Sequence, residues 1–132
     1  KILDAALPKA VEKQFKPLVT TVLDARGAVN ITASQASTSL TRAALAHGKA
    51  WAALATAVGS PAPFQRAQEQ AYFVSAVNTM AQGRLVPVPG GVLIQDGTTL
   101  LGAIGVSGDT SDNDEICAIA GIEAAGLKAN PG

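Results

Sequence analysis

Cysteine and histidine are nearly absent from this sequence, which has one of each among 132 residues. The single cysteine, Cys117, cannot form an intrachain disulfide, which fits a reducing compartment without proving it. The single histidine, His47, would have to serve a catalytic triad alone, and a zinc site has no second histidine or cysteine to draw on. These scarcities argue against a disulfide scaffold, a zinc centre and a serine hydrolase.

Charge is also scarce, since only 15% of the residues are charged and ten basic side chains balance ten acidic ones. No run of lysine or arginine supplies the basic patch that nucleic acids and anionic membranes require, so neither is an expected partner. No apolar run approaches the roughly 20 residues that span a bilayer. No signal-peptide pattern opens the chain. Cytoplasmic localisation is therefore the expectation, with a removed export signal as the alternative.

Apolar residues make up 48% of the chain, and many of them are small. A domain of this size with so few charges either exposes a surface of mostly small and apolar residues or covers part of that surface in an oligomer. The alanine- and glycine-rich helices favour the oligomer. The length predicts one domain over residues 1–132. The protein itself is thus the expected macromolecular partner.

The hydrophobic spacing predicts helices, hairpins and their order along the chain. Helices are expected over residues 2–15, 39–58 and 64–81, and a last one begins with a cap at Ser111 or Asp112 and ends at Gly126. Residues 59–63 are expected to stop the second helix. Two β-hairpins are expected, one over 18–23 and 28–32, the other over 91–94 and 100–106 around Asp96-Gly97. This order predicts an α+β fold with an antiparallel sheet of about five strands flanked by helices.

The segment from Val86 to Glu115 is the most informative part of the chain. Its glycines at 102, 105 and 108 fall every third residue, so the G-x-G-x-x-G loop of a dinucleotide site is not present. Ser107 likewise lacks the G-x-S-x-G frame of a nucleophile elbow. Familiar nucleotide-binding and hydrolase motifs are therefore not indicated here.

Acidic side chains follow those glycines, from Asp109 to Glu115. Their oxygens are ligands that Ca²⁺ or Mg²⁺ prefers, but the spacing is not that of an EF-hand. One interpretation is a capping box between Ser111 and Asp114, with carboxylates at the positive end of the helix dipole. The other is a ligand or cation contact, for which the candidate residues are Asp109, Asp112 and Glu115.

His47 lies on one helical stripe with Ala44, Trp51 and Leu54. A flat porphyrin could share this apolar setting, and it could equally be core, so His47 is either a haem-iron ligand or a structural residue. Arg42 and Lys49, on another face of this helix, could meet carboxylates of a ligand or of a neighbouring subunit, although a solvated face is the commoner outcome. Cys117 is interpreted as a small buried hydrophobe.

Several motifs occur together in an order and spacing that identify a family. In chain order they are Val22-Leu23-Asp24-Ala25-Arg26-Gly27, Gly48-Lys49-Ala50-Trp51, Pro89-Gly90-Gly91-Val92-Leu93-Ile94, Gly102 to Glu115, Cys117-Ala118 and Ala120-Gly121-Ile122. They resemble the GlcG/HbpS-like family, also described as haem-binding-protein-like or PduO C-terminal-domain-like, over roughly residues 18–127. The resemblance implies a single domain with an antiparallel sheet and helices, and dimers that build larger oligomers. Some members bind haem, and others belong to pathways for small carbon compounds.

The leading hypothesis from the sequence is an oligomeric protein that binds a small ligand, namely haem or a related tetrapyrrole as cofactor. His47 is nominated as the iron ligand by its chemistry rather than carried over from the family. The further candidate cofactor contacts are Trp51, Lys49, Gly90 and Gly91. The alternative is an enzyme or accessory protein of small-molecule catabolism. Its site would lie where the glycine-rich turn, Ser107 and the acidic helix start converge, with Asp109, Asp112 or Glu115 as a general base or cation ligand.

Overall fold

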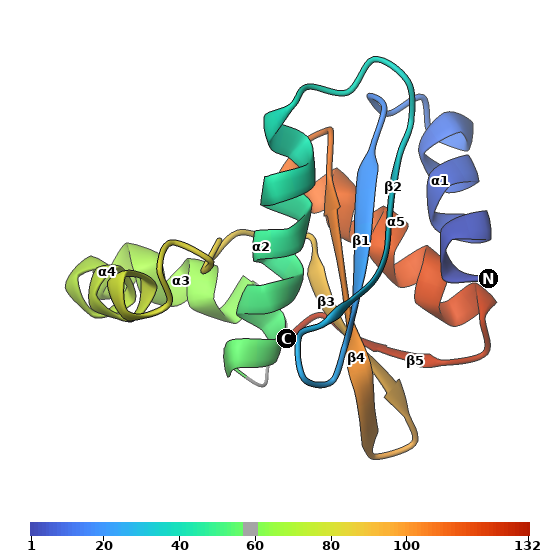
Figure 1. Ribbon diagram of the computed structural model, residues 1–132. Coiled ribbons are helices and arrows are strands. Elements are labelled where there is room, and N and C mark those ends of the chain that lie inside the picture. Colours follow the sequence, from blue (N-terminus) through green and yellow to red (C-terminus); the bar gives the residue numbers. More distant parts are fainter. Residues whose placement is uncertain (57–60) are drawn as a thin grey trace.

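The computed structural model describes residues 1–56 and 61–132, which form one sheet and the helices around it (Figure 1). The helices are α1 (Ile2–Glu12), α2 (Thr41–Thr56), α3 (Pro61–Glu69), α4 (Ala71–Met80) and α5 (Ser111–Ala124). The strands are β1 (Val19–Asp24), β2 (Val29–Ser34), β3 (Gly91–Asp96), β4 (Thr99–Ser107) and β5 (Lys128–Asn130).

The sheet is antiparallel throughout and has the strand order β2-β1-β4-β3-β5. Both predicted hairpins are confirmed, β1 with β2 and β3 with β4. The second hairpin turns at Gly97-Thr98, between the paired residues Asp96 and Thr99. The predicted α+β class with about five antiparallel strands is therefore confirmed.

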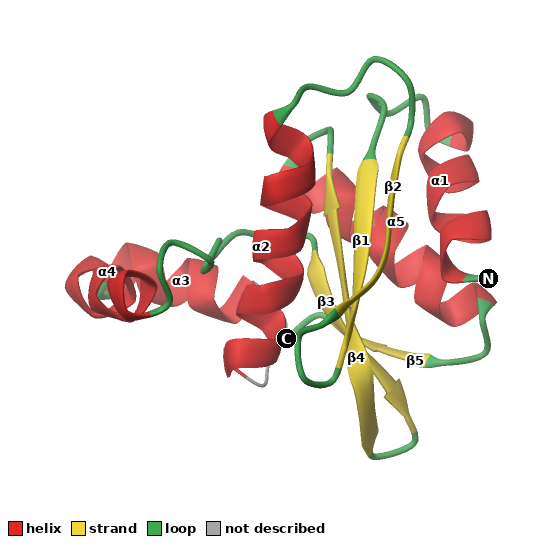
Figure 2. Cartoon of the chain, in the orientation of Figure 1, coloured by secondary structure: helices red, strands yellow, loops and turns green. Residues whose placement is uncertain are grey.

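Helices cover both faces of this sheet (Figure 2). On one face, α1 and α5 pack over alternate residues of the central strands, among them Val92, Ile104 and Val106, together with Cys117 and Ile122 of α5. On the other face, α2 packs its alanines against the intervening positions, such as Leu93 and Ala103. The period-2 alternation of β3 and β4 thus supplies two cores from one pair of strands.

The packing of α2 on the sheet is unusually close at Gly105 of β4. A Cβ atom at this position would run into the carbonyl group of Ala46, which belongs to the helix backbone. Only glycine lets the helix and strand backbones approach this far. This contact fixes the distance between α2 and the sheet, and therefore the positions of the side chains on α2.

Several predicted helix boundaries are wrong. The first helix ends at Glu12 instead of Phe15, and α2 runs from Thr41 to Thr56; the predicted end at Val58, like Gly59 and Ser60, lies outside the described residues. Pro61 belongs to the segment that is expected to stop a helix, yet it begins α3, because the first turn of a helix needs no N–H from proline. The expected helix over 64–81 is two helices, broken at Gln70 with φ −136° and ψ 62°.

The two short helices α3 and α4 project beyond the sheet beside the end of α2 (Figure 1). They are anchored through a small cluster of Ala52, Val74 and Leu85, while Tyr72 and Met80 of α4 are largely exposed. Within the described residues, no helix combines the length and apolarity needed to cross a membrane.

Candidate functional site

The first turn of α5 is organised by Thr110 and Asp114. The Thr110 side-chain oxygen accepts a hydrogen bond from the Asn113 backbone N–H at 3.2 Å, so Thr110 is the N-cap. The prediction that Ser111 or Asp112 caps this helix, with Ser111 and Asp114 as a capping box, is wrong. Asp114 instead turns inward, where its Oδ1 accepts from the Asp109 backbone N–H at 2.9 Å.

Asp114 also forms a buried ion pair with Lys49 of α2, at 2.9 Å between Nζ and Oδ2. The two side chains are 4% and 0% exposed, so the interpretation of Lys49 as part of a solvated face is wrong. Burial lowers the pKa of the Lys49 ammonium, and the attraction of Asp114 offsets part of that shift. The pair joins α2 to α5, helices on opposite faces of the sheet.

Gly90, just before β3, makes room for this ion pair. Its φ is +112°, and a Cβ there would lie 3.0 Å from Lys49 Nζ and 2.8 Å from the Val106 carbonyl oxygen. Glycine is therefore required both by the backbone conformation and by the contact with Lys49. The structure thus brings together two of the predicted cofactor contacts, Lys49 and Gly90, but around an internal ion pair.

Glu115 is half-buried next to this pair. Burial, followed by the nearby carboxylate of Asp112, raises the pKa of Glu115, while a hydrogen bond from the Gly90 backbone and the charge of Lys49 act in the opposite direction. Its Oε2 is buried, and no described residue hydrogen bonds to it. Of the acidic candidates, Glu115 is the one that retains an unsatisfied polar atom.

Asp109 and Asp112 offer less to a ligand. The Asn113 side-chain amide donates to Asp109 Oδ2, and the Lys16 backbone N–H donates to Oδ1 at 3.4 Å. The hydrogen bond from Asn113 is the main reason why the pKa of Asp109 is lowered. Asp112 is exposed. Among the residues that the structure describes, no three His, Cys, Asp or Glu side chains cluster as a metal site would require.

His47 and Trp51 are half-buried on α2, one turn apart. Trp51 packs with Leu54 against the core, and the Arg84 guanidinium lies 5.0 Å from its ring centroid. Beside it is a cleft of about 200 Å³ lined by Ala25, Arg26, Gly27, Trp51, Leu54 and Ala55. The cleft lies between α2 and the β1–β2 turn. His47 lies one helical turn before Trp51, nearer the start of α2, and does not line the cleft.

The β1–β2 turn that forms one wall of this cleft is held by Asp24. Its Oδ1 accepts from the backbone N–H groups of Arg26 at 2.9 Å and Ala28 at 3.0 Å, and these bonds lower the pKa of Asp24. The turn thereby presents the exposed Arg26 side chain at the rim of the cleft.

A second cleft, of about 210 Å³, lies at the other end of α2. It is lined by Lys16, Pro17, Ser37, Thr38, Ser39, Arg42 and Gly108. Arg42 is fixed by a hydrogen bond from Nη1 to the Oγ of buried Ser107 at 3.2 Å. The sequence suggested Ser107 as a nucleophile, which its motif did not support, and as part of the alternative site at the acidic helix start. In the structure Ser107 positions a guanidinium.

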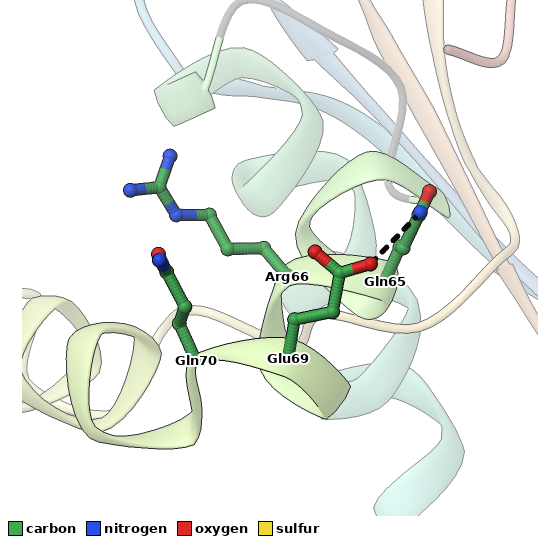
Figure 3. Close-up of a pocket in the computed structure, with 4 residues that line it drawn as sticks. All are labelled: Gln65, Arg66, Glu69 and Gln70. Carbon is green, nitrogen blue, oxygen red and sulfur yellow. Dashed lines mark hydrogen bonds between the residues drawn. The ribbon is translucent and has the colours of Figure 1, made fainter.

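A third depression, of about 330 Å³, separates α3 from α4 and is lined by Gln65, Arg66, Glu69 and Gln70 (Figure 3). Gln65 donates to Glu69 at 3.1 Å, and Arg66 points away from that pair and stacks over the Phe73 ring. The four lining side chains are half- or fully exposed. All four lining residues come from α3 and the break that follows it, so the depression contains none of the candidate site residues.

Cys117 is fully buried in the core beneath α5 and forms no disulfide. Burial raises the pKa of its thiol to about 11, with the carboxylates of Asp114 and Asp109 acting in the same direction. A thiol with this pKa is protonated at neutral pH and a poor nucleophile. The prediction of a small buried hydrophobe is confirmed.

The ion pair of Lys49 with Asp114 was not predicted from the sequence. One signal was available, because Lys49 lies on the same stripe of α2 as Ala46, Ala50 and Ala53, which are small residues typical of close contact with a sheet. A lysine on such a stripe must meet a buried acceptor, since an unpaired charge is not tolerated there. Asp114 could not be singled out among the neighbouring carboxylates.

Comparison with known proteins assigns the family. The model of the family described as haem degrading protein HbpS-like matches residues 1–123, so the chain belongs to that family. No sequence among curated proteins matches it. Three solved structures illustrate the likeness, which extends over most of each chain.

The crystal structure of a PduOC–heme complex is 27% identical, with a TM-score of 0.87, covering 96% of this chain and 91% of that one. The Klebsiella pneumoniae protein ORFY is 22% identical, with a TM-score of 0.84 and coverage of 92% and 83%. A double mutant of Streptomyces reticuli HbpS is 21% identical, with a TM-score of 0.79 and coverage of 94% and 81%. The predicted GlcG/HbpS-like resemblance is therefore confirmed.

Proposed function

We propose that this protein binds haem or a related tetrapyrrole, and that His47 is the axial ligand to the iron. The observation that carries the proposal is the likeness of nearly the whole chain to a haem complex at 27% identity. Family membership agrees with it. His47 is the one imidazole of the chain, and neutral imidazole is a common ligand of haem iron.

The tetrapyrrole would lie along α2, between its His47–Trp51–Leu54 side and the β1–β2 turn. Trp51 and Leu54 give the cleft an apolar wall for the ring. Arg26 on the opposite rim offers a guanidinium to a propionate carboxylate, a pairing with matched geometry. His47 precedes Trp51 by one helical turn, about 5.4 Å along the axis, so both side chains would be available to the same ligand.

The cleft is too small to enclose such a ligand alone. Its volume is about 200 Å³, whereas pockets for drug-sized ligands usually measure about 300–1,000 Å³. We therefore propose that a second copy of the chain covers the exposed side of the ring, which makes ligand binding a property of a homo-oligomer. Gly90, Gly91 and Lys49 belong to the internal ion-pair region, so they would support the fold rather than contact the ring.

Titration with hemin tests the proposal. Saturable binding should give a Soret band with the ligand-field features of histidine ligation, and His47→Ala should lose those features. Added imidazole should restore them, because free imidazole can occupy the position that the side chain has vacated. Glu123→Ala provides a control variant, since Glu123 is exposed on α5, on the other face of the sheet from the proposed groove.

Three results would count against the proposal in different ways. An unchanged spectrum in His47→Ala would remove His47 from the site while leaving haem binding in place. Absence of a saturable Soret band in the unmodified protein would remove haem itself. A loss in His47→Ala that imidazole does not restore, with unchanged thermal unfolding, would assign His47 a role other than ligation.

A further inference from the structure

The cleft at the start of α2 is built from four segments that are far apart in the sequence. Lys16 and Pro17 come from the α1–β1 connection, Ser37 to Ser39 from the β2–α2 loop, Arg42 from α2, and Gly108 from the β4–α5 connection. It lies beyond the opposite end of α2 from the proposed tetrapyrrole groove. The fold thus assembles a second recess, independent of haem binding.

Donor groups dominate the lining of this recess. Lys16 and Arg42 supply two cations, and Ser37 supplies a hydroxyl group. The Ser39 hydroxyl shares a hydrogen bond with the Thr41 hydroxyl at 3.3 Å, and the Thr38 hydroxyl donates to the Gln35 carbonyl oxygen at 3.1 Å. A guanidinium has five N–H donors, and the structure commits one of those of Arg42 to Ser107. The remaining donors can converge on a ligand that has several acceptor oxygens.

Arg42 is held in place for such a role. Its partner Ser107 is 0% exposed, so the hydrogen bond anchors the half-buried guanidinium at the floor of the recess. A guanidinium fixed before the ligand arrives loses less conformational freedom on binding. The start of the 16-residue helix α2 adds positive potential at the same place.

The size and charge of the recess identify the class of ligand. A volume of about 210 Å³ accommodates an ion of a few atoms. The carboxylate of Asp109 accepts from the Lys16 backbone N–H at 3.4 Å, so the two cations of the lining have one anion beside them. We infer that the recess binds a small tetrahedral oxyanion, either free phosphate or the phosphate group of a small ester, through Arg42, Lys16 and the loop hydroxyls.

Calorimetry with inorganic phosphate, in a buffer free of other oxyanions, tests this inference. Arg42→Gln and Lys16→Gln should each weaken binding about tenfold or more, since hydrogen bonds to charged groups contribute on that order. Asp109→Asn should tighten binding, because it removes the nearby negative charge. Lys128→Gln, which removes an exposed cation on β5, should leave binding unchanged.

Comparison of ligands then identifies the source of the oxyanion. Equal affinity for phosphate and glycerol phosphate assigns the free ion, and tighter binding of glycerol phosphate assigns an ester. Tighter binding of acetate than of either overturns the tetrahedral assignment, and absence of saturable binding overturns the site. Weakening by Lys128→Gln to the same extent as by Arg42→Gln would also overturn it. His47→Ala should bind phosphate normally, which separates this result from that of the hemin titration.

Discussion

Lys49 and Asp114 show how two charged residues can be buried in a domain with little charge. Their ion pair is almost completely dehydrated, but each partner has further support: Asp114 accepts from the Asp109 backbone, and Gly90 leaves space for the ammonium group. A buried pair of this kind need not stabilise the fold relative to apolar residues of the same shape. Its loss on one side, however, leaves a charge without a partner.

Lys49→Met should therefore be strongly destabilising. We expect a loss of about 3–5 kcal/mol in the free energy of unfolding, because the Asp114 carboxylate would remain buried without its cation. Adding Asp114→Asn should recover much of this loss, since the amide oxygen can still accept from the Asp109 N–H while the charge is removed. Urea unfolding of the single and double variants measures both effects.

The matched control is Lys9→Met, which breaks the exposed ion pair between Lys9 and Glu12, at 3.1 Å. Exposed pairs contribute about 0–1 kcal/mol, so this variant should unfold almost like the unmodified protein. If Lys49→Met cost no more than Lys9→Met, the buried pair would have no special role in stability.

At the scale of single elements, the stability of α5 depends on its N-cap, and the sequence alone does not show which residue forms this cap. Three successive residues, Thr110, Ser111 and Asp112, are all of types that favour the N-cap position. The structure selects Thr110, because Asp109 and Asp114 fix the preceding backbone. Thr110→Ala should cost about 1 kcal/mol, whereas Ser111→Ala, already inside the helix, should cost only a few tenths. Thermal unfolding of the two variants checks this, and a larger effect at Ser111 would contradict the assigned cap.

The elements that could be predicted from the sequence are those with a strong period or a strong turn signal. The apolar runs around Asp24-Ala25-Arg26-Gly27 and Asp96-Gly97 predict both hairpins, and these account for four of the five strands. The three-residue strand β5, Lys128–Asn130, carries no β-branched residue and forms only because the edge of β3 is open to it. The helix break at Gln70 has no proline or glycine beside it, so the sequence did not predict it.

The candidate site was less accessible to sequence reasoning than the fold. Trp51 and His47 could be placed on one side of α2 by their spacing, and the structure keeps both half-buried there. Lys49 and Asp114, 65 residues apart, meet only because helices from opposite faces of the sheet converge beyond the start of β3. The recess around Arg42 draws on four separate segments, so no local pattern could have indicated it.

For the whole molecule, the short helices α3 and α4 raise the question of what stabilises them. Their lengths of nine and ten residues are below the roughly 12–15 residues at which isolated helices become even marginal. In α4, Val74 is the one buried residue, and Tyr72 and Met80 are 75% and 80% exposed. Exposed large apolar side chains on a projecting arm are typical of a surface that another subunit covers. These observations favour α4 as part of the proposed oligomer interface.

Replacing Tyr72 and Met80 together by glutamate should therefore dissociate the oligomer, because two buried charges without partners would oppose assembly. Sedimentation velocity should show the unmodified protein as an oligomer and the double variant as a monomer with an unchanged far-ultraviolet circular dichroism spectrum. Leu40→Glu is the control, since Leu40 is 96% exposed but precedes α2, away from the arm. Its mass should remain that of the unmodified protein. An unmodified protein that is monomeric at all concentrations would refute the oligomer, and dissociation by Leu40→Glu with no effect of the arm variant would place the interface at the start of α2 instead. Because we propose that a second copy covers the tetrapyrrole, the monomeric variant should also bind hemin more weakly while retaining the affinity of the Arg42 recess for phosphate.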